Sequence, residues 1–125
     1  MSGLEFALVV VAGAVGAGLR SIVDGVVQRG RPDAFPLGIA IVNASGAVVL
    51  GVLTGLGATI GAEWLAVAGI GLLGGYTTFS TVMVETVLLG RRGRRSWAWM
   101  NLIGTFVVAL VSASLGAMIG GVVPR

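Results

Sequence analysis

The chain has 125 residues, of which 56% are hydrophobic and only 10% are charged. A soluble domain carries roughly 25% charged residues, so this chain has too little charge to cover a surface that faces water, and lipid is its natural solvent. All eight basic residues are arginine, and the lack of lysine, histidine and cysteine excludes disulfides, histidine bases, soft-metal sites and a lysine-bearing phosphate loop. No nucleophile paired with a base is visible, so we do not expect an enzyme.

Four long apolar segments follow one another along the chain and predict four membrane spans. They cover about residues 4–27, 37–60, 64–89 and 97–123. At about 1.5 Å per residue, each segment as a helix can cross a hydrocarbon core of about 30 Å. Because backbone groups in lipid must pair within the segment and strand alternation is absent, we predict an all-α integral membrane protein, with residues 1–125 forming a single transmembrane domain.

The arginines between the segments predict how the chain is oriented in the cell membrane. Loops one and three, with the end of the first segment, hold seven of them: Arg20, Arg29, Arg31, Arg91, Arg92, Arg94 and Arg95. The opposite side, with both termini and loop two, holds Arg125. Since positively charged loops stay in the cytoplasm, we predict that loops one and three are cytoplasmic and that both termini lie outside.

Two stripes of small and polar residues run along the second and fourth segments. In the second, Asn43, Ala47, Gly51 and Gly55 recur every four residues and share one helix face. In the fourth, the stripe consists of Asn101, Thr105, Ala109, Ser112 and Gly116. We expect both stripes to face protein or a narrow aqueous path, because small residues let helices approach closely. For the fourth segment, plain helix packing with hydroxyls bonded to their own helix stays open as an alternative.

The third segment contains the string Gly74-Gly75-Tyr76-Thr77-Thr78-Phe79-Ser80-Thr81 near its middle. Glycine loosens the backbone and threonine loses rotamer freedom in a helix, so this string is poor helix material. Backbone that unwinds at this depth must have its hydrogen bonds replaced, and freed carbonyl oxygens are good ligands for a hard cation. We therefore predict a break near the membrane centre, with glycines used for close packing as the alternative.

Motifs in three of the segments, taken in their order along the chain, resemble those of the Fluc (CrcB) family of fluoride channels. The resemblance covers nearly the whole chain. The first segment has Gly13 and Gly16-Ala17-Gly18-Leu19-Arg20, similar to the family's G-x-x-G-A-x-x-R. The second has Phe35-Pro36-Leu37-Gly38 and Val42-Asn43-Ala44-Ser45-Gly46, similar to P-x-G-T-x-x-x-N-x-x-G. The third has the string at 74–81 followed by Glu85, similar to G-G-x-T-T-F-S-T-F-x-x-E, which is highly specific.

The resemblance implies an antiparallel dimer with two narrow pores and one structural sodium ion (Na+) at its centre. The backbone carbonyls of Gly74 and Thr77 would bind this sodium. The implied activity is that of a fluoride-specific ion channel subunit, which lowers cytoplasmic fluoride by passive export of the anion. A negative cell interior pushes an anion outward, so an open pore suffices.

The resemblance also assigns uncharged donors to the fluoride path. Such groups suit a small, strongly hydrated anion that must be held without being trapped. Asn43 would donate an amide N–H, and Phe79 would offer the positive edge of its ring. Hydroxyls would extend the polar track, and the candidates are Ser80, Thr81, Thr105 and Ser112.

Two charged residues have alternative roles under the resemblance. Arg20 would gather anions at the pore mouth, or it would simply reach the membrane interface through its long apolar stem. Glu85 would line the pore exit, or it would end its helix beside the arginine-rich loop.

Two positions depart from the family pattern, and both remove groups from the implied ion path. Val82 stands where the family has a second phenylalanine, and Ile39 stands where it has a threonine. The dimer could join two copies or two different chains. The arginine bias suggests the hypothesis that the partner is a related, paralogous chain of opposite orientation and that one of the two pores is defective.

The alternative function is a small multidrug-resistance-type exporter, which exchanges protons for cationic drugs. Such a transporter needs a carboxylate embedded in the membrane. Glu85 is the main candidate, because Glu5 lies too near the end of its segment.

Overall fold

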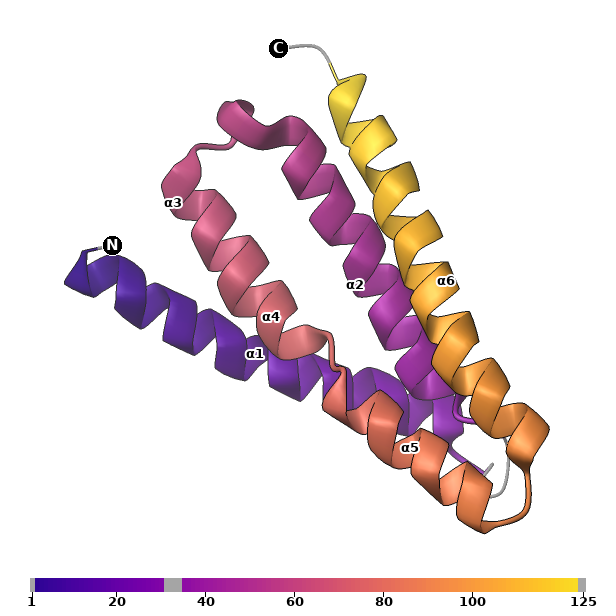
Figure 1. Cartoon of the computed structure of the whole chain (residues 1–125). Coiled ribbons are helices and arrows are strands. Elements are labelled where there is room, and N and C mark those ends of the chain that lie inside the picture. The colour runs from indigo at the N-terminus through magenta and orange to yellow at the C-terminus, as the bar shows by residue number, and fades with distance from the viewer. Residues whose placement is uncertain (1, 31–34, 124–125) are drawn as a thin grey trace.

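The computed structural model describes residues 2–30 and 35–123 of the chain. Its elements are, in order, α1 (Gly3–Gln28), α2 (Leu37–Leu56), a 3-10 turn (Gly57–Thr59), α3 (Ala62–Leu65), a π-helical stretch (Ala66–Leu73), α4 (Gly74–Tyr76), α5 (Ser80–Arg91) and α6 (Arg95–Gly121) (Figure 1). Within the described residues, four helical stretches are long and apolar enough to cross a membrane: Gly3–Gln28, Leu37–Leu56, Ala62–Arg91 and Arg95–Gly121. The predicted all-α membrane protein with four spans is confirmed.

Local residues account for where the first two spans begin and end. The Oγ of Ser2 accepts the backbone N–H of Glu5 at 3.1 Å and caps the start of α1. The α-helix of the second span ends at Leu56, before the expected boundary at residue 60, because Gly57 has a φ of 48°. Gly61, with a φ of 92°, then turns the chain into α3. Glycine adopts both conformations without a Cβ clash.

Helices α2 and α6 form the most extensive pair in the molecule and run side by side (Figure 1). Glycines build their contact: Gly51 and Gly55 of α2 face the backbone of α6, and Gly116 and Gly120 of α6 face the backbone of α2. A Cβ atom at any of the four would collide with the opposite main chain. The two helices therefore approach through their smallest residues, which is how helices associate in lipid.

Helix α1 packs against the first half of the third span through a second glycine contact. Gly16 faces the backbone at Leu72, and Gly75 faces the carbonyl of Gly13. This half of the span includes the π-helical stretch, whose hydrogen bonds span five residues, as from the Gly74 N–H to the Gly69 carbonyl. The sequence pattern does not predict that stretch.

The third span is broken between α4 and α5, which confirms the break predicted from the string at 74–81. Thr77 is extended, with φ −76° and ψ 154°, and the helix restarts at Ser80. In Figure 1 the ribbon loses its coil between the two helices. The break divides the span into a half that packs on α1 and a half, α5, that packs on α6.

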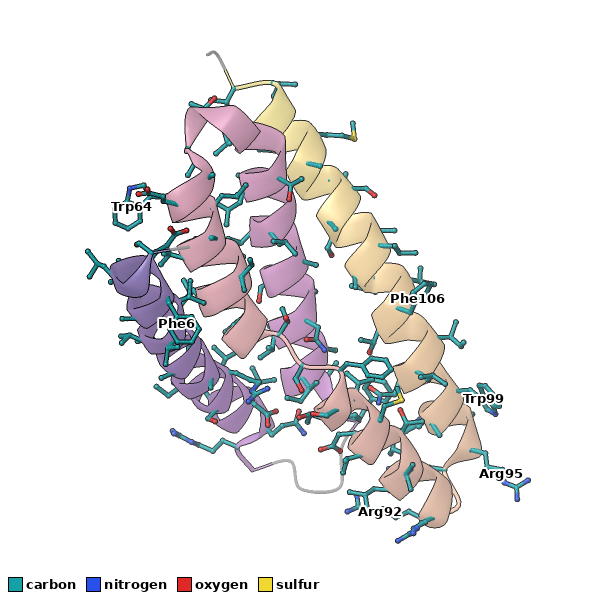
Figure 2. All side chains as sticks on the ribbon, turned by 60° about the vertical axis from the view of Figure 1, so that its left-hand side comes forward. Phe6, Trp64, Arg92, Arg95, Trp99 and Phe106 are labelled. Carbon is teal, nitrogen blue, oxygen red and sulfur yellow. The ribbon has the colours of Figure 1, made fainter. Side chains whose placement is uncertain are left out.

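The outer surface of the described chain is largely apolar. Only 6% of the most apolar part of α1, and the same share of α6, is buried. A surface of this kind suits lipid or a partner chain. Figure 2 shows Trp64 toward the upper part of the molecule and Arg92 and Arg95, at the turn from α5 into α6, at its lower end. The basic residues of loop three thus gather at one end of the spans.

Candidate functional site

Asn43 of α2 holds the break in the third span. Its Oδ1 accepts the backbone N–H of Thr78 at 2.8 Å, and its Nδ2 donates to the Thr78 carbonyl at 2.9 Å. Both residues are 8% exposed. The amide replaces the two hydrogen bonds that the Thr78 backbone gives up, which is the condition for unwound backbone inside a membrane. An amide nitrogen carries two hydrogens, so Asn43 keeps a second N–H for another acceptor.

The side chain of Thr78 begins α5. Its Oγ1 accepts the backbone N–H of Thr81 at 3.2 Å and donates to the Thr81 Oγ1 at 3.1 Å. A side-chain oxygen that accepts the N–H three residues on is the usual cap of a helix start. The Ser80 Oγ lies 3.3 Å from the same oxygen. Three hydroxyls therefore gather at the N-terminal end of α5.

The same hydrogen bonds release two backbone carbonyls. In a continuous helix the Thr78 N–H would pair with the carbonyl of Gly74, but here it donates to Asn43. Likewise the Thr81 N–H, the helical partner of the Thr77 carbonyl, donates to the Thr78 hydroxyl. Gly74 and Thr77 are the residues whose carbonyls the family resemblance assigns to sodium. Neutral oxygen ligands suit a hard cation, so the residues present fit that ion.

A cavity of about 540 Å³ lies beside the break, between α2, α5 and α6. Its lining includes three of the predicted pore residues, Asn43, Phe79 and Thr105, and the predicted sodium ligand Thr77. Phe79 is 76% exposed, so its ring stands at the open side of the cavity. None of the described residues that line the cavity is charged, and most are apolar. The cavity therefore offers uncharged donors in a largely apolar surrounding.

The other predicted site residues lie outside this lining. Ser80 and Thr81 stand beside it at the start of α5, where both are bonded to Thr78. Gly74 is exposed on α4. Arg20 on α1, Glu85 on α5 and Ser112 on α6 are each half-buried. Their assigned roles stay predictions.

The two departures from the family pattern are both buried. Ile39 and Val82 are each 3% exposed, and Val82 forms part of the cavity wall. Phe106 of α6, which is 65% exposed, is a further aromatic residue among those that line the cavity (Figure 2). Sequence reasoning missed Phe106. Phe106 directly follows Thr105, which belongs to the stripe of the fourth segment, and this position is the signal that could have found it.

Asn101 shows that packing explains part of the α6 stripe. It is 2% exposed, and its Nδ2 donates to the Thr86 hydroxyl at 2.9 Å and to the Val82 carbonyl at 3.3 Å, which ties α6 to α5. Gly116, at the other end of the stripe, faces α2. Thr105 and Ala109 lie between them and line the cavity. The stripe therefore packs at its ends and faces the cavity in its middle.

Thr78 is the second site residue that sequence reasoning missed. A threonine that follows poor helix formers and precedes an apolar run is a candidate helix cap, and that signal could have found it. The bond between the Tyr76 hydroxyl and the Ser45 hydroxyl, at 3.0 Å, ties the same region to α2 and was not expected either.

A family model described as CrcB-like protein, Camphor Resistance (CrcB), matches residues 7–117. The chain belongs to this CrcB family. A relative from Leifsonia xyli subsp. xyli, named fluoride-specific ion channel FluC 1, is 40% identical over 123 residues, which cover 97% of this chain and 90% of the relative. A relative of the same name from Rubrobacter xylanophilus is 41% identical, with 96% of each chain covered. The fluoride-specific ion channel FluC 2 of Mycolicibacterium paratuberculosis is 40% identical, with 92% of this chain and 93% of the relative covered.

Proposed function

We propose that this chain is a subunit of a fluoride-specific ion channel in the cell membrane and that it lowers cytoplasmic fluoride by passive export of the anion. The CrcB relatives described above are named fluoride-specific ion channels. The observation that carries the proposal is the cavity at the break in the third span, which Asn43 and Phe79 both line and whose described lining is uncharged. A channel of this kind is not an enzyme.

The proposed path replaces the water around fluoride with directed, uncharged donors. The second N–H of Asn43 and the ring edge of Phe79 are the first two donors, because both residues line the cavity. The hydroxyl of Thr105 lies in the same wall. The hydroxyls of Ser80, Thr81 and Ser112 extend the polar track in the proposal. Uncharged donors hold a small anion without trapping it, so the membrane potential can drive it outward.

Arg20 and Glu85 belong to the ends of this path in the proposal. Arg20 lies in the second half of α1, and its positive charge would raise the local concentration of anions. Glu85 lies on α5, between the cavity and the arginine-rich connection to α6.

Sodium has a structural role in the proposal and is not transported. The carbonyls of Gly74 and Thr77 would hold it, since the N–H groups that would pair with them in a helix are diverted to side chains. Among the described residues, no group of three or more acidic, histidine or cysteine side chains could hold a metal ion. The ion would supply a fixed positive charge and tie the broken spans together.

The functional unit in the proposal is an antiparallel dimer. The cavity is open on one side, and the exposed rings of Phe79 and Phe106 leave room for a second chain to complete its wall. The seven-to-one arginine bias favours a paralogous partner that inserts with the opposite orientation. Fluoride efflux from liposomes that contain this chain and no partner would refute obligate pairing.

No observation favours the multidrug exporter. The relatives carry the name of an ion channel. Glu85, the carboxylate that an exporter would need, is not among the residues that line the cavity.

Fluoride efflux from liposomes, followed with a fluoride electrode, tests the proposed function. We expect the unaltered chain, by itself or with its paralogous partner, to conduct fluoride. Phe79→Leu should conduct about tenfold more slowly, because a lost ring-edge contact of roughly 1.4 kcal/mol corresponds to that factor. Since Phe79 is 76% exposed, the free energy of unfolding should change by less than about 0.5 kcal/mol.

Phe6→Leu is the matched control for this experiment. Phe6 is also exposed, at 62%, but it lies on α1 and does not line the cavity. Its efflux rate should equal that of the unaltered chain. If neither assembly of the unaltered chain conducts fluoride, the channel proposal is wrong.

Sodium removal should lower the stability of the conducting assembly. An ion that binds only the folded state stabilises it by mass action, by about 2.7 kcal/mol at 100 times its dissociation constant. We therefore expect the unfolding midpoint in detergent to fall when sodium is replaced by N-methylglucamine at constant ionic strength. An unfolding midpoint that stays the same across both cations would argue against a sodium site.

The orientation of the chain can be tested with reporters fused to its C-terminus. Both termini are predicted outside the cytoplasm, so a fused alkaline phosphatase should be active and a fused green fluorescent protein should be dark. Replacing the four arginines at positions 91, 92, 94 and 95 with glutamine should weaken this preference. A fluorescent fusion of the unaltered chain would contradict the proposed orientation and place the C-terminus in the cytoplasm.

A further inference from the structure

Thr78 is a buried residue at the break, and the proposed fluoride path gives it no role. It is 8% exposed. Its backbone N–H and its carbonyl are both bonded to the Asn43 amide, at 2.8 and 2.9 Å. Those two bonds satisfy the interrupted backbone at Thr78. The hydrogen bonds of its side-chain hydroxyl are therefore not needed to satisfy that backbone and have another role.

The hydroxyl of Thr78 has a defined set of partners. A threonine hydroxyl has one hydrogen to donate and two lone pairs that accept. Its hydrogen is directed to the Thr81 Oγ1 at 3.1 Å, and one lone pair accepts the Thr81 N–H at 3.2 Å. The Ser80 Oγ lies 3.3 Å away, and because the Thr78 hydrogen is directed to Thr81, Ser80 can bond to Thr78 only as the donor.

These hydrogen bonds leave the hydroxyls of Thr81 and Ser80 with different capacities to donate to a further acceptor. The Thr81 oxygen accepts from Thr78, so the Thr81 hydrogen must point away from Thr78 and is free to donate elsewhere. The Ser80 hydrogen, in contrast, is used on Thr78. Only one of the two hydroxyls thus keeps a donor for an anion.

We infer that Thr78 is a positioning residue for conduction. Its hydroxyl fixes where α5 starts and orients the Thr81 hydroxyl as a donor to the anion, while Ser80 serves to hold Thr78. This inference rests on the proposed fluoride channel, and it adds the residue that sets which hydroxyl of α5 binds the ion.

The test compares fluoride efflux for two substitutions of Thr78 in the assembly in which the unaltered chain conducts. Thr78→Val keeps the shape and removes the hydroxyl, and we expect efflux to slow about tenfold. Thr78→Ser restores the hydroxyl and should restore the rate. Equal slowing by both substitutions would mean that packing, not the hydroxyl, matters, and normal efflux with Thr78→Val would overturn the inference.

Thr86→Val is the matched control. The Thr86 hydroxyl also makes two hydrogen bonds, to the Val82 carbonyl at 2.8 Å and with the Asn101 amide at 2.9 Å, but Thr86 neither lines the cavity nor lies at the break. We expect Thr86→Val to lower the unfolding midpoint and to leave the efflux rate per folded protein unchanged. A loss of efflux equal to that of Thr78→Val would show that any lost hydroxyl of α5 has this effect.

A second pair of variants decides the inference even if Thr78→Val does not fold. Thr81→Val should slow efflux about tenfold, and Ser80→Ala should slow it less, because the Ser80 hydrogen is directed to Thr78 and Ser80 acts on the anion only through Thr78. The opposite order, or equal slowing by both, would overturn the inference. Where Thr78→Val does fold, adding it to Thr81→Val should cause no further loss, since both act through one donor.

Failure of this inference can be told apart from failure of the proposed function. If the unaltered chain moves no fluoride in either assembly, both fall together. If the unaltered chain conducts and the Thr78 and Thr81 variants conduct equally well, only the positioning role falls.

Discussion

Replacing Asn43 with leucine is expected to slow fluoride efflux about 100-fold. The substitution removes the donor proposed for the anion and also both bonds to the Thr78 backbone. A hydrogen bond to a charged group contributes roughly 1.5–3 kcal/mol, and a loss of about 2.7 kcal/mol in the stabilisation of the anion corresponds to a factor of 100. Electrode measurements of efflux, normalised to the amount of folded protein recovered from the liposomes, check this expectation.

Asn43→Asp separates the two roles of the side chain. The carboxylate keeps an acceptor for the Thr78 N–H, which is bonded at 2.8 Å, but it loses the donors and places a negative charge beside the cavity. We expect this variant to be less stable, because the Thr78 carbonyl loses its donor, and to conduct almost no fluoride per folded molecule, because a fixed negative charge repels an anion. Conduction by Asn43→Asp at the rate of the unaltered chain would show that Asn43 is structural.

Asn101→Leu is the control for the Asn43 variants. Asn101 is 2% exposed against 8% for Asn43, and like Asn43 its amide donates to a backbone carbonyl, but its partners, Val82 and Thr86, lie within α5 and not in the break. We expect a loss of stability with little change in efflux per folded molecule. An efflux loss as large as that of Asn43→Leu would mean that any buried amide in these spans has the same effect.

Replacing Gly116 with alanine should destabilise the fold by about 1–3 kcal/mol. The added Cβ would collide with the backbone carbonyl of Val48 on α2, and main chain cannot move aside as a side chain can. The two helices must then separate, which weakens the most extensive helix contact in the molecule. Unfolding in detergent mixtures of rising sodium dodecyl sulfate content measures the change. Gly51→Ala should act in the same way, because its Cβ would meet the Ala113 carbonyl.

Gly104→Ala is the matched control on the same helix. No heavy atom outside its own helix lies within 4 Å of a Cβ built there. Alanine favours the helix over glycine by up to about 1 kcal/mol, so this variant should be neutral or more stable. The opposite signs at two glycines of α6 identify the interface. Equal effects at positions 104 and 116 would mean that helix propensity, not close approach, governs α6.

The amino-acid sequence alone predicts that the chain lies in lipid, that it has four spans and that the third span is broken. Each of these features depends on local composition. Long runs without charge can satisfy their backbone in lipid only as helices, and two glycines followed by two threonines weaken the helix wherever they occur. The order of motifs along the chain also identified the family. Which residues of the third span face the cavity was predictable only in part: Phe79 lines it, whereas Ser80 and Thr81 stand beside it.

The tertiary structure decided which groups satisfy the break. Asn43 and Thr78 are 35 residues apart, and nothing in the spacing of α2 states that its amide meets the backbone of that one threonine. The tertiary structure likewise divided the stripe of the fourth segment, with Asn101 against α5, Gly116 against α2 and Thr105 toward the cavity. Sequence spacing places residues on one face of a helix, but the neighbour that each residue meets depends on how the helices cross, which the packing of the whole bundle determines.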